Sequence, residues 1–128
     1  MAVRLNHTIV ACRDQRRAAD FFCEIFGLPP ATRFGPFLDV EVDNGVTFAF
    51  DEWNPDDIVG QHYAFLVDED DFDAIFGRVV ARGLDYWADP MKSQPGEINY
   101  HDGGRGVYFD DLDGHFLEII TRPYGSGG

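Results

Sequence analysis

The sequence predicts an α+β fold made of two copies of one unit, each with the element order β-α-β-β-β. Strand-like and helix-like segments recur in this order with a period of about 55 residues, a spacing typical of an internal structural repeat. Superposing His7 on His62 also places Phe21 over Phe76. Two such half-units are expected to pair around a shared cavity, and 128 residues are enough for one domain with a core.

The first unit covers about residues 4–53 and begins with a strand at 4–12. Asp14 is expected to cap a helix whose apolar residues recur at helical spacing, and Gly27 is expected to end it. Three further strands are expected at 31–34, 37–42 and 46–50, and Asn44-Gly45 predicts a hairpin between the last two. Residues 51–60, rich in acidic residues with Pro and Gly, are expected to form a linker.

The second unit covers about residues 61–122 and repeats this order. Asp68 is expected to cap its helix and Gly83 to end it. Strands are expected at 62–67, 84–90, 106–111 and 115–121, with a loop at 91–104 and a turn at Asp113-Gly114. Residues 1–125 are therefore expected to form a single domain, followed by a flexible tail at 126–128.

Composition excludes several classes of function. A formal net charge of −13 argues against nucleic-acid binding, which favours a basic surface. No apolar run approaches the roughly 20 residues that a membrane span needs. The N-terminal residues lack the layout of a signal peptide, and neither Cys12 nor Cys23 has CxxC spacing, so a cytoplasmic location is expected.

Three polar side chains interrupt apolar strands, namely His7, His62 and Glu118. A buried carboxylate needs a partner, and alternation along the strands directs all three side chains away from the helices and into the cavity. Two imidazoles and one carboxylate suit a divalent metal and leave coordination positions open. The alternative is two separate core histidines and a carboxylate that is hydrogen-bonded at a strand end.

The chain resembles the vicinal oxygen chelate superfamily over about residues 4–122. This superfamily includes glyoxalase I, bleomycin-resistance proteins, fosfomycin-resistance enzymes and extradiol dioxygenases. The resemblance is carried by LNHTIV, RDQRRAADFFCEIFGLP, QHYAFLV and, most specifically, GRGVYFDDLDGHFLEIITRP. It implies two βαβββ modules that form a U-shaped mixed sheet around a metal-binding cavity, and it implies a homodimer.

The resemblance matches the metal ligands of the superfamily to His7, His62 and Glu118. Glyoxalase I-type members use a fourth ligand, a Glu in the last strand of the first module. Aligning the two hairpin turns places Ala49 at this position. Three protein ligands fit dioxygenase-like or fosfomycin-resistance-like members better than glyoxalase I. Ferrous iron is the favoured metal, with zinc, manganese or nickel as alternatives.

Two further side chains are candidate catalytic residues. Tyr108, on the strand next to Glu118, matches a tyrosine of extradiol dioxygenases that donates a hydrogen bond to the bound substrate; its alternative role is packing. His101 is a candidate acid or base, because histidine titrates near physiological pH; its alternative is an exposed loop residue. His115 shares an H-x-x-E pattern with Glu118, but residues three apart on a strand face opposite ways, so His115 is expected to be a turn residue.

These observations predict a divalent-metal-dependent enzyme that acts on a small bidentate oxygen substrate, in a dioxygenase-like or lyase-like reaction. The alternative is a non-catalytic binding protein of the bleomycin-resistance type. Members of that type lack the metal residues that this chain retains.

Overall fold

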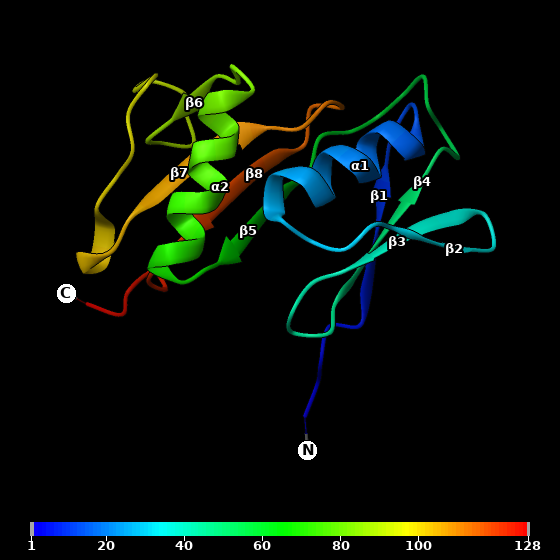
Figure 1. The fold of residues 1–128 in the computed structure, drawn as a ribbon, viewed down its shortest axis with the longest axis horizontal. Helices are drawn as coiled ribbons and strands as arrows, with labels where there is room; N and C mark the ends of the chain where they lie inside the picture. The colour runs from blue at the N-terminus through cyan, green and yellow to red at the C-terminus, as the bar shows by residue number, and fades with distance from the viewer. Residues whose placement is uncertain (1, 128) are drawn as a thin grey trace. The chain divides into compact units, whose positions relative to one another are not determined.

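The computed structural model describes residues 2–127. It divides into two compact units, of which the first ends at Val59 and the second begins at Gly60 (Figure 1). Each unit has one α-helix and a four-stranded mixed sheet, in the chain order β-α-β-β-β. The predicted α+β class with two such modules is therefore confirmed. Neither helix within residues 2–127 has the length and apolar character needed to cross a membrane.

The sheet of the first unit has the strand order β1-β4-β3-β2, in which β1 runs parallel to β4 and the other pairs are antiparallel. The helix α1 contacts β3 and β4, and Phe22 of α1 stacks on Phe48 with ring centroids 5.1 Å apart. The opposite face of this sheet carries His7. The elements are β1 (His7–Ala11), α1 (Gln15–Phe26), β2 (Thr32–Phe34), β3 (Phe37–Glu41) and β4 (Thr47–Asp51).

Both predicted ends of α1 are confirmed. The Asp14 carboxylate accepts a hydrogen bond from the Arg17 backbone N–H at 3.1 Å, which satisfies one of the unpaired donors of the first turn. Gly27 has φ of 68°, a left-handed conformation that glycine adopts without steric cost, and its N–H donates to the Cys23 carbonyl.

The sheet of the second unit has the matching order β5-β8-β7-β6, again with one parallel pair, β5 and β8. The helix α2 lies across this sheet (Figure 1) and buries Phe72, Ile75 and Val79. The elements are β5 (His62–Leu66), α2 (Glu69–Ala81), β6 (Tyr86–Trp87), a short 3-10 helix η1 (His101–Gly103), β7 (Gly106–Asp110) and β8 (Phe116–Ile120).

Two details of the second unit differ from the sequence prediction. Strand β6 has only two residues, because the Asp89 carboxylate binds the backbone N–H groups of Ser93 and Gln94 and turns the chain back. Asp68 does occupy the N-cap position, but its side chain makes no capping hydrogen bond. Three acidic residues in the first turn of α2 instead interact favourably with the helix dipole.

The two units share the same strand register. Ile9 pairs with Ala49 across β1 and β4 in the way that Ala64 pairs with Glu118 across β5 and β8. Both hairpins close with the same three-residue turn, which contains Gly45 or Gly114. The superposition of Ala49 on Glu118 predicted from the sequence is therefore a structural equivalence.

His115 follows the second hairpin turn, as expected, but it is buried. Its Nδ1 accepts a hydrogen bond from the Gln61 backbone N–H at 3.0 Å, and its side chain is part of the core. The Asp111 carboxylate accepts hydrogen bonds from the backbone N–H groups of Asp113 and His115, and burial raises the pKa of Asp111. Thus His115 stabilises the entry to β8.

Replacing Gly114 by alanine is expected to lower the free energy of unfolding by about 1 kcal/mol, because its φ of 85° is unfavourable for a residue with a Cβ. Gly77 is the matched control: it is exposed inside α2 with open space around it, so Gly77→Ala is expected to stabilise by up to about 1 kcal/mol. Urea denaturation of both variants measures the two effects. Equal effects of the same sign would contradict this account of the turn.

Candidate metal centre

Glu118 of β8 and His62 of the neighbouring edge strand β5 form a polar pair in the second sheet. The Glu118 side chain is only 2% exposed, and its Oε1 lies 3.0 Å from His62 Nε2. His62 is half exposed, because it stands at the start of β5. The structure thus confirms that the buried carboxylate has a partner from the neighbouring strand.

The hydrogen bonds of His62 indicate which of its two ring nitrogens carries a hydrogen. Its Nδ1 lies 2.9 Å from the Phe116 carbonyl, which can only accept, so Nδ1 carries a hydrogen. In the neutral ring, Nε2 then presents a lone pair to the carboxylate oxygen. Two lone pairs at 3.0 Å repel, so this contact requires a proton between His62 Nε2 and Glu118 Oε1, or a metal ion that binds both.

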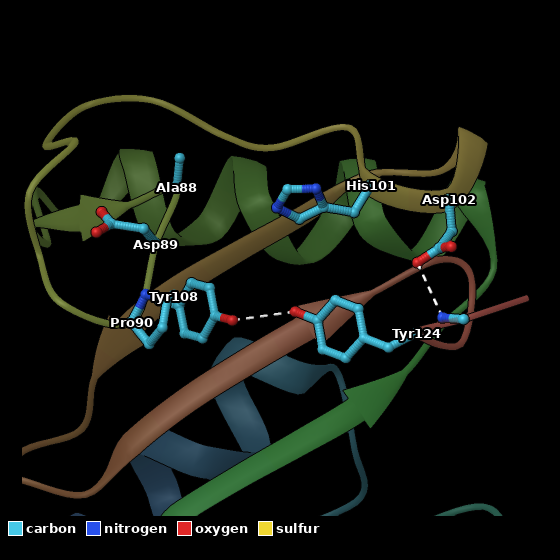
Figure 2. Close-up of a pocket in the computed structure, with 8 residues that line it drawn as sticks. Ala88, Asp89, Pro90, His101, Asp102, Tyr108 and Tyr124 are labelled. Atoms are coloured by element: carbon cyan, nitrogen blue, oxygen red, sulfur yellow. Dashed lines mark hydrogen bonds between the residues drawn. The ribbon is translucent and has the colours of Figure 1, made fainter. Parts of the chain in front are cut away.

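The second oxygen of Glu118 is held by two tyrosines. The Tyr124 hydroxyl donates to Glu118 Oε2, and the Tyr108 hydroxyl lies 3.0 Å from the Tyr124 hydroxyl (Figure 2). Because the Tyr124 proton is used on Glu118, Tyr108 donates to Tyr124. Burial raises the pKa of both tyrosines, and for Tyr124 the hydrogen bond to Glu118 raises it further, so both remain protonated donors.

A cavity of about 460 Å³ opens beside these tyrosines within the second unit. His101, on η1, lines it, and its ring lies 6.4 Å from that of Tyr124 (Figure 2). Asp102 accepts hydrogen bonds at 3.2 Å from the backbone N–H groups of Gly125 and Gly127, which hold the C-terminal segment against the cavity. The C-terminal segment therefore positions the Tyr124 hydroxyl next to Glu118.

His7 belongs to the first unit. Its Nδ1 lies 2.7 Å from Asn6 Oδ1; with that nitrogen donating to the amide oxygen, the Nε2 lone pair is available to a ligand. Within residues 2–127, no three His, Cys, Asp or Glu side chains form a group that could hold a metal. The structure brings His62 and Glu118 together, and the participation of His7 stays a prediction.

The donor set of the second unit fits a divalent metal. An imidazole and a carboxylate suit zinc and iron, and an Nδ1–H that donates to a backbone carbonyl orients the ring for coordination through Nε2. Ala49 occupies the equivalent position in the first unit and has no donor atom. The first unit therefore supplies no carboxylate at the position equivalent to Glu118.

Sequence reasoning missed Tyr124. It lies beyond the last strand, and neither strand alternation nor the repeat assigns it a position. The only local signal is an aromatic residue six positions after Glu118 in a Gly-rich end segment.

Comparisons with known proteins agree with the fold. The sequence profile described as the Glyoxalase/Bleomycin resistance protein/Dioxygenase superfamily matches residues 4–119, and the chain belongs to this superfamily. It is 32% identical over 125 residues to the glutathione transferase FosA of Serratia marcescens, with 93% of this chain and 81% of that protein covered.

Two solved structures are more similar. The oxidase ChaP-H2 has 57% sequence identity and a TM-score of 0.96, with both chains covered completely. The oxidase ChaP-H1 has 56% identity and a TM-score of 0.93, with 97% of this chain and 99% of that chain covered.

Removing the Tyr124 hydroxyl is expected to destabilise the metal-free protein. Tyr124→Phe leaves a buried carboxylate oxygen without a side-chain donor, and a loss of about 1 to 3 kcal/mol in the free energy of unfolding is expected. Tyr100→Phe is the control, since Tyr100 is 69% exposed, and it should change stability by less than about 0.5 kcal/mol. Indistinguishable unfolding curves for the two variants would show that the Tyr124 hydroxyl does not stabilise Glu118.

Proposed function

We propose that the protein is a divalent-metal-dependent enzyme in which His7, His62 and Glu118 hold the metal. The observation that carries the proposal is the 3.0 Å contact between His62 Nε2 and the buried Glu118 carboxylate, with His62 Nδ1 committed to a carbonyl. The likeness to two oxidases at 57% and 56% identity supports oxidative chemistry, and within it we favour a dioxygenase-like reaction with ferrous iron.

Three protein ligands leave coordination positions for a small substrate that binds through two oxygen atoms. When bound, the metal supplies Lewis-acid chemistry, and iron also allows reaction with dioxygen. Glu118 contributes the negative charge that offsets the charge of the metal, and Tyr124 fixes the direction of this carboxylate. His62 is oriented by the Phe116 carbonyl.

Tyr108 and His101 are the proposed catalytic residues. Tyr108 is 6% exposed and lines the cavity, and its hydroxyl can turn its proton from Tyr124 to an anionic substrate oxygen. His101 lies on the short η1 helix at the same cavity and can exchange a proton with a bound substrate. Both roles require that the substrate occupies this cavity.

A lyase or transferase reaction is the second candidate. The 32% identity to a glutathione transferase supports it, and this reaction class does not require a redox-active metal. Metal analysis of the protein as purified separates the two: iron supports oxidation, whereas zinc, manganese or nickel supports lyase or transferase chemistry. A protein that binds its ligand with no metal would instead be a binding protein.

The purified protein is expected to contain about one divalent metal per chain, with Glu118→Gln removing most of it, because the amide keeps the shape but loses the charge. Glu97→Gln removes a charge from an exposed loop and serves as the control. Elemental analysis measures metal content, and thermal unfolding should show that metal raises the Tm of the wild type but not of Glu118→Gln. Equal metal in all three proteins would refute the assignment of Glu118.

We also propose a homodimer, and a mixing experiment decides whether the site is shared between chains. His7→Ala and Glu118→Ala should each lose metal. If each site combines His7 of one chain with Glu118 of its partner, unfolding and refolding the two variants together in equal amounts should restore about a quarter of the wild-type metal. If each site lies within one chain, the mixture should restore none.

A monomer by light scattering would contradict both the dimer and the shared site. In that case the three ligands would have to come from a single chain.

A further inference from the structure

The first unit contains a second cavity, of about 240 Å³, on the sheet face that carries His7. Its walls are mainly apolar, and one acidic side chain, Asp39 of β3, lies among them. The lining residues are Asn6, His7, Ile9, Phe34, Phe37, Asp39, Thr47 and Ala49. The face belongs to the open side of the sheet, since Ile9 is 48% exposed.

Asp39 has an unsatisfied oxygen. Its Oδ1 is sealed from solvent, and no group of residues 2–127 donates a hydrogen bond to it. Buried polar atoms are nearly always paired, and an unpaired carboxylate oxygen destabilises the folded protein. The terminal torsion of aspartate is soft, so either carboxylate oxygen can turn toward the cavity that the side chain lines.

The position of Asp39 in the repeat links it to the proposed active site. Asp39 pairs with Ala49 across β3 and β4, in the same way that Tyr108 pairs with Glu118 across β7 and β8. Asp39 is therefore the counterpart of Tyr108. The second unit places a hydrogen-bond donor at this position, and the first unit places an acceptor there.

The space between Asp39 and His7 fits a small molecule. The two residues lie on strands separated by β4 and are offset by two residues in register, so their backbones are roughly 12 Å apart across the sheet. Thr47, opposite His7, and Ala49, opposite Asp39, lie between them on β4, and both have short side chains. The side chains of His7 and Asp39 line the same cavity. A ligand near His7 would extend over Ala49 toward the carboxylate.

We propose that Asp39 is a substrate-binding residue that accepts a hydrogen bond from a donor group of the substrate. The substrate class is then an oxygen chelator with an apolar body and, beyond its metal-binding oxygens, a hydroxyl or an ammonium group that reaches Asp39. The placement of the chelating oxygens near His7 rests on the proposed function. The pairing of Asp39 with a donor group rests only on the cavity of the first unit.

The test uses metal-free protein and three probes of one shape: 2-phenylethanol, 2-phenylethylammonium and ethylbenzene. In a nitrogen-15 NMR titration, the alcohol and the ammonium should each shift the backbone signals of Thr47 and Ala49. Each of these two probes should bind at least about tenfold more tightly than ethylbenzene. Preference for the ammonium would assign a cationic substrate group, and equal binding or preference for the alcohol would assign a hydroxyl.

Asp39→Leu should abolish this preference and raise the Tm of the ligand-free protein, because it removes the unsatisfied oxygen. A purely structural aspartate would lower the Tm when replaced. Asp39→Asn should retain alcohol binding through its amide oxygen and lose the ammonium. Glu41→Gln, an exposed acid on the same strand and face, should leave binding and Tm unchanged.

Equal binding of all three probes to the wild type would overturn the proposal, as would a Tm that falls in Asp39→Leu. The metal proposal and the Asp39 proposal can fail independently. Glu118→Gln should leave the alcohol titration unchanged, and Asp39→Leu should leave the metal content unchanged.

Discussion

The contact between Glu118 and His62 is the constraint on which the second unit depends. A carboxylate that is 2% exposed in the last strand is tolerated only with partners on both oxygens. The parallel pairing of β5 with β8 brings His62 to one oxygen, and the C-terminal segment brings Tyr124 to the other. The strand order, the register and the path of the chain after β8 together place the partners of Glu118.

The repeat explains how one scaffold yields two different faces. The registers of the units match, so each polar position has a counterpart: Ala49 for Glu118, and Asp39 for Tyr108. In the second unit these positions hold a negative ligand and a neutral donor. In the first unit they hold a small apolar residue and an acceptor. In the proposed function, this asymmetry would give the metal three protein ligands and leave coordination positions for a chelating substrate.

Much of the fold could be predicted from the sequence, because local signals determined it: Asp14 and Gly27 bound α1, and the strand patterns and turn residues predicted most of the strands and both hairpins. Strand alternation also predicted that Glu118 needs a partner. Alternation could not predict Tyr124, which is positioned by hydrogen bonds from the end segment to a loop carboxylate. It also could not show that Asp39 has an unpaired oxygen, because pairing depends on side chains distant in sequence.

Anomalous X-ray scattering from crystals of the metal-loaded protein would show directly which side chains bind the metal. We expect one anomalous peak per chain, about 2.0 to 2.2 Å from His62 Nε2, from a Glu118 oxygen and from the Nε2 of a His7. The source of that His7, the same chain or a partner, would be visible in the same map. A metal peak that lies away from Glu118, or one bound by Glu118 without any His7, would refute the three-ligand site.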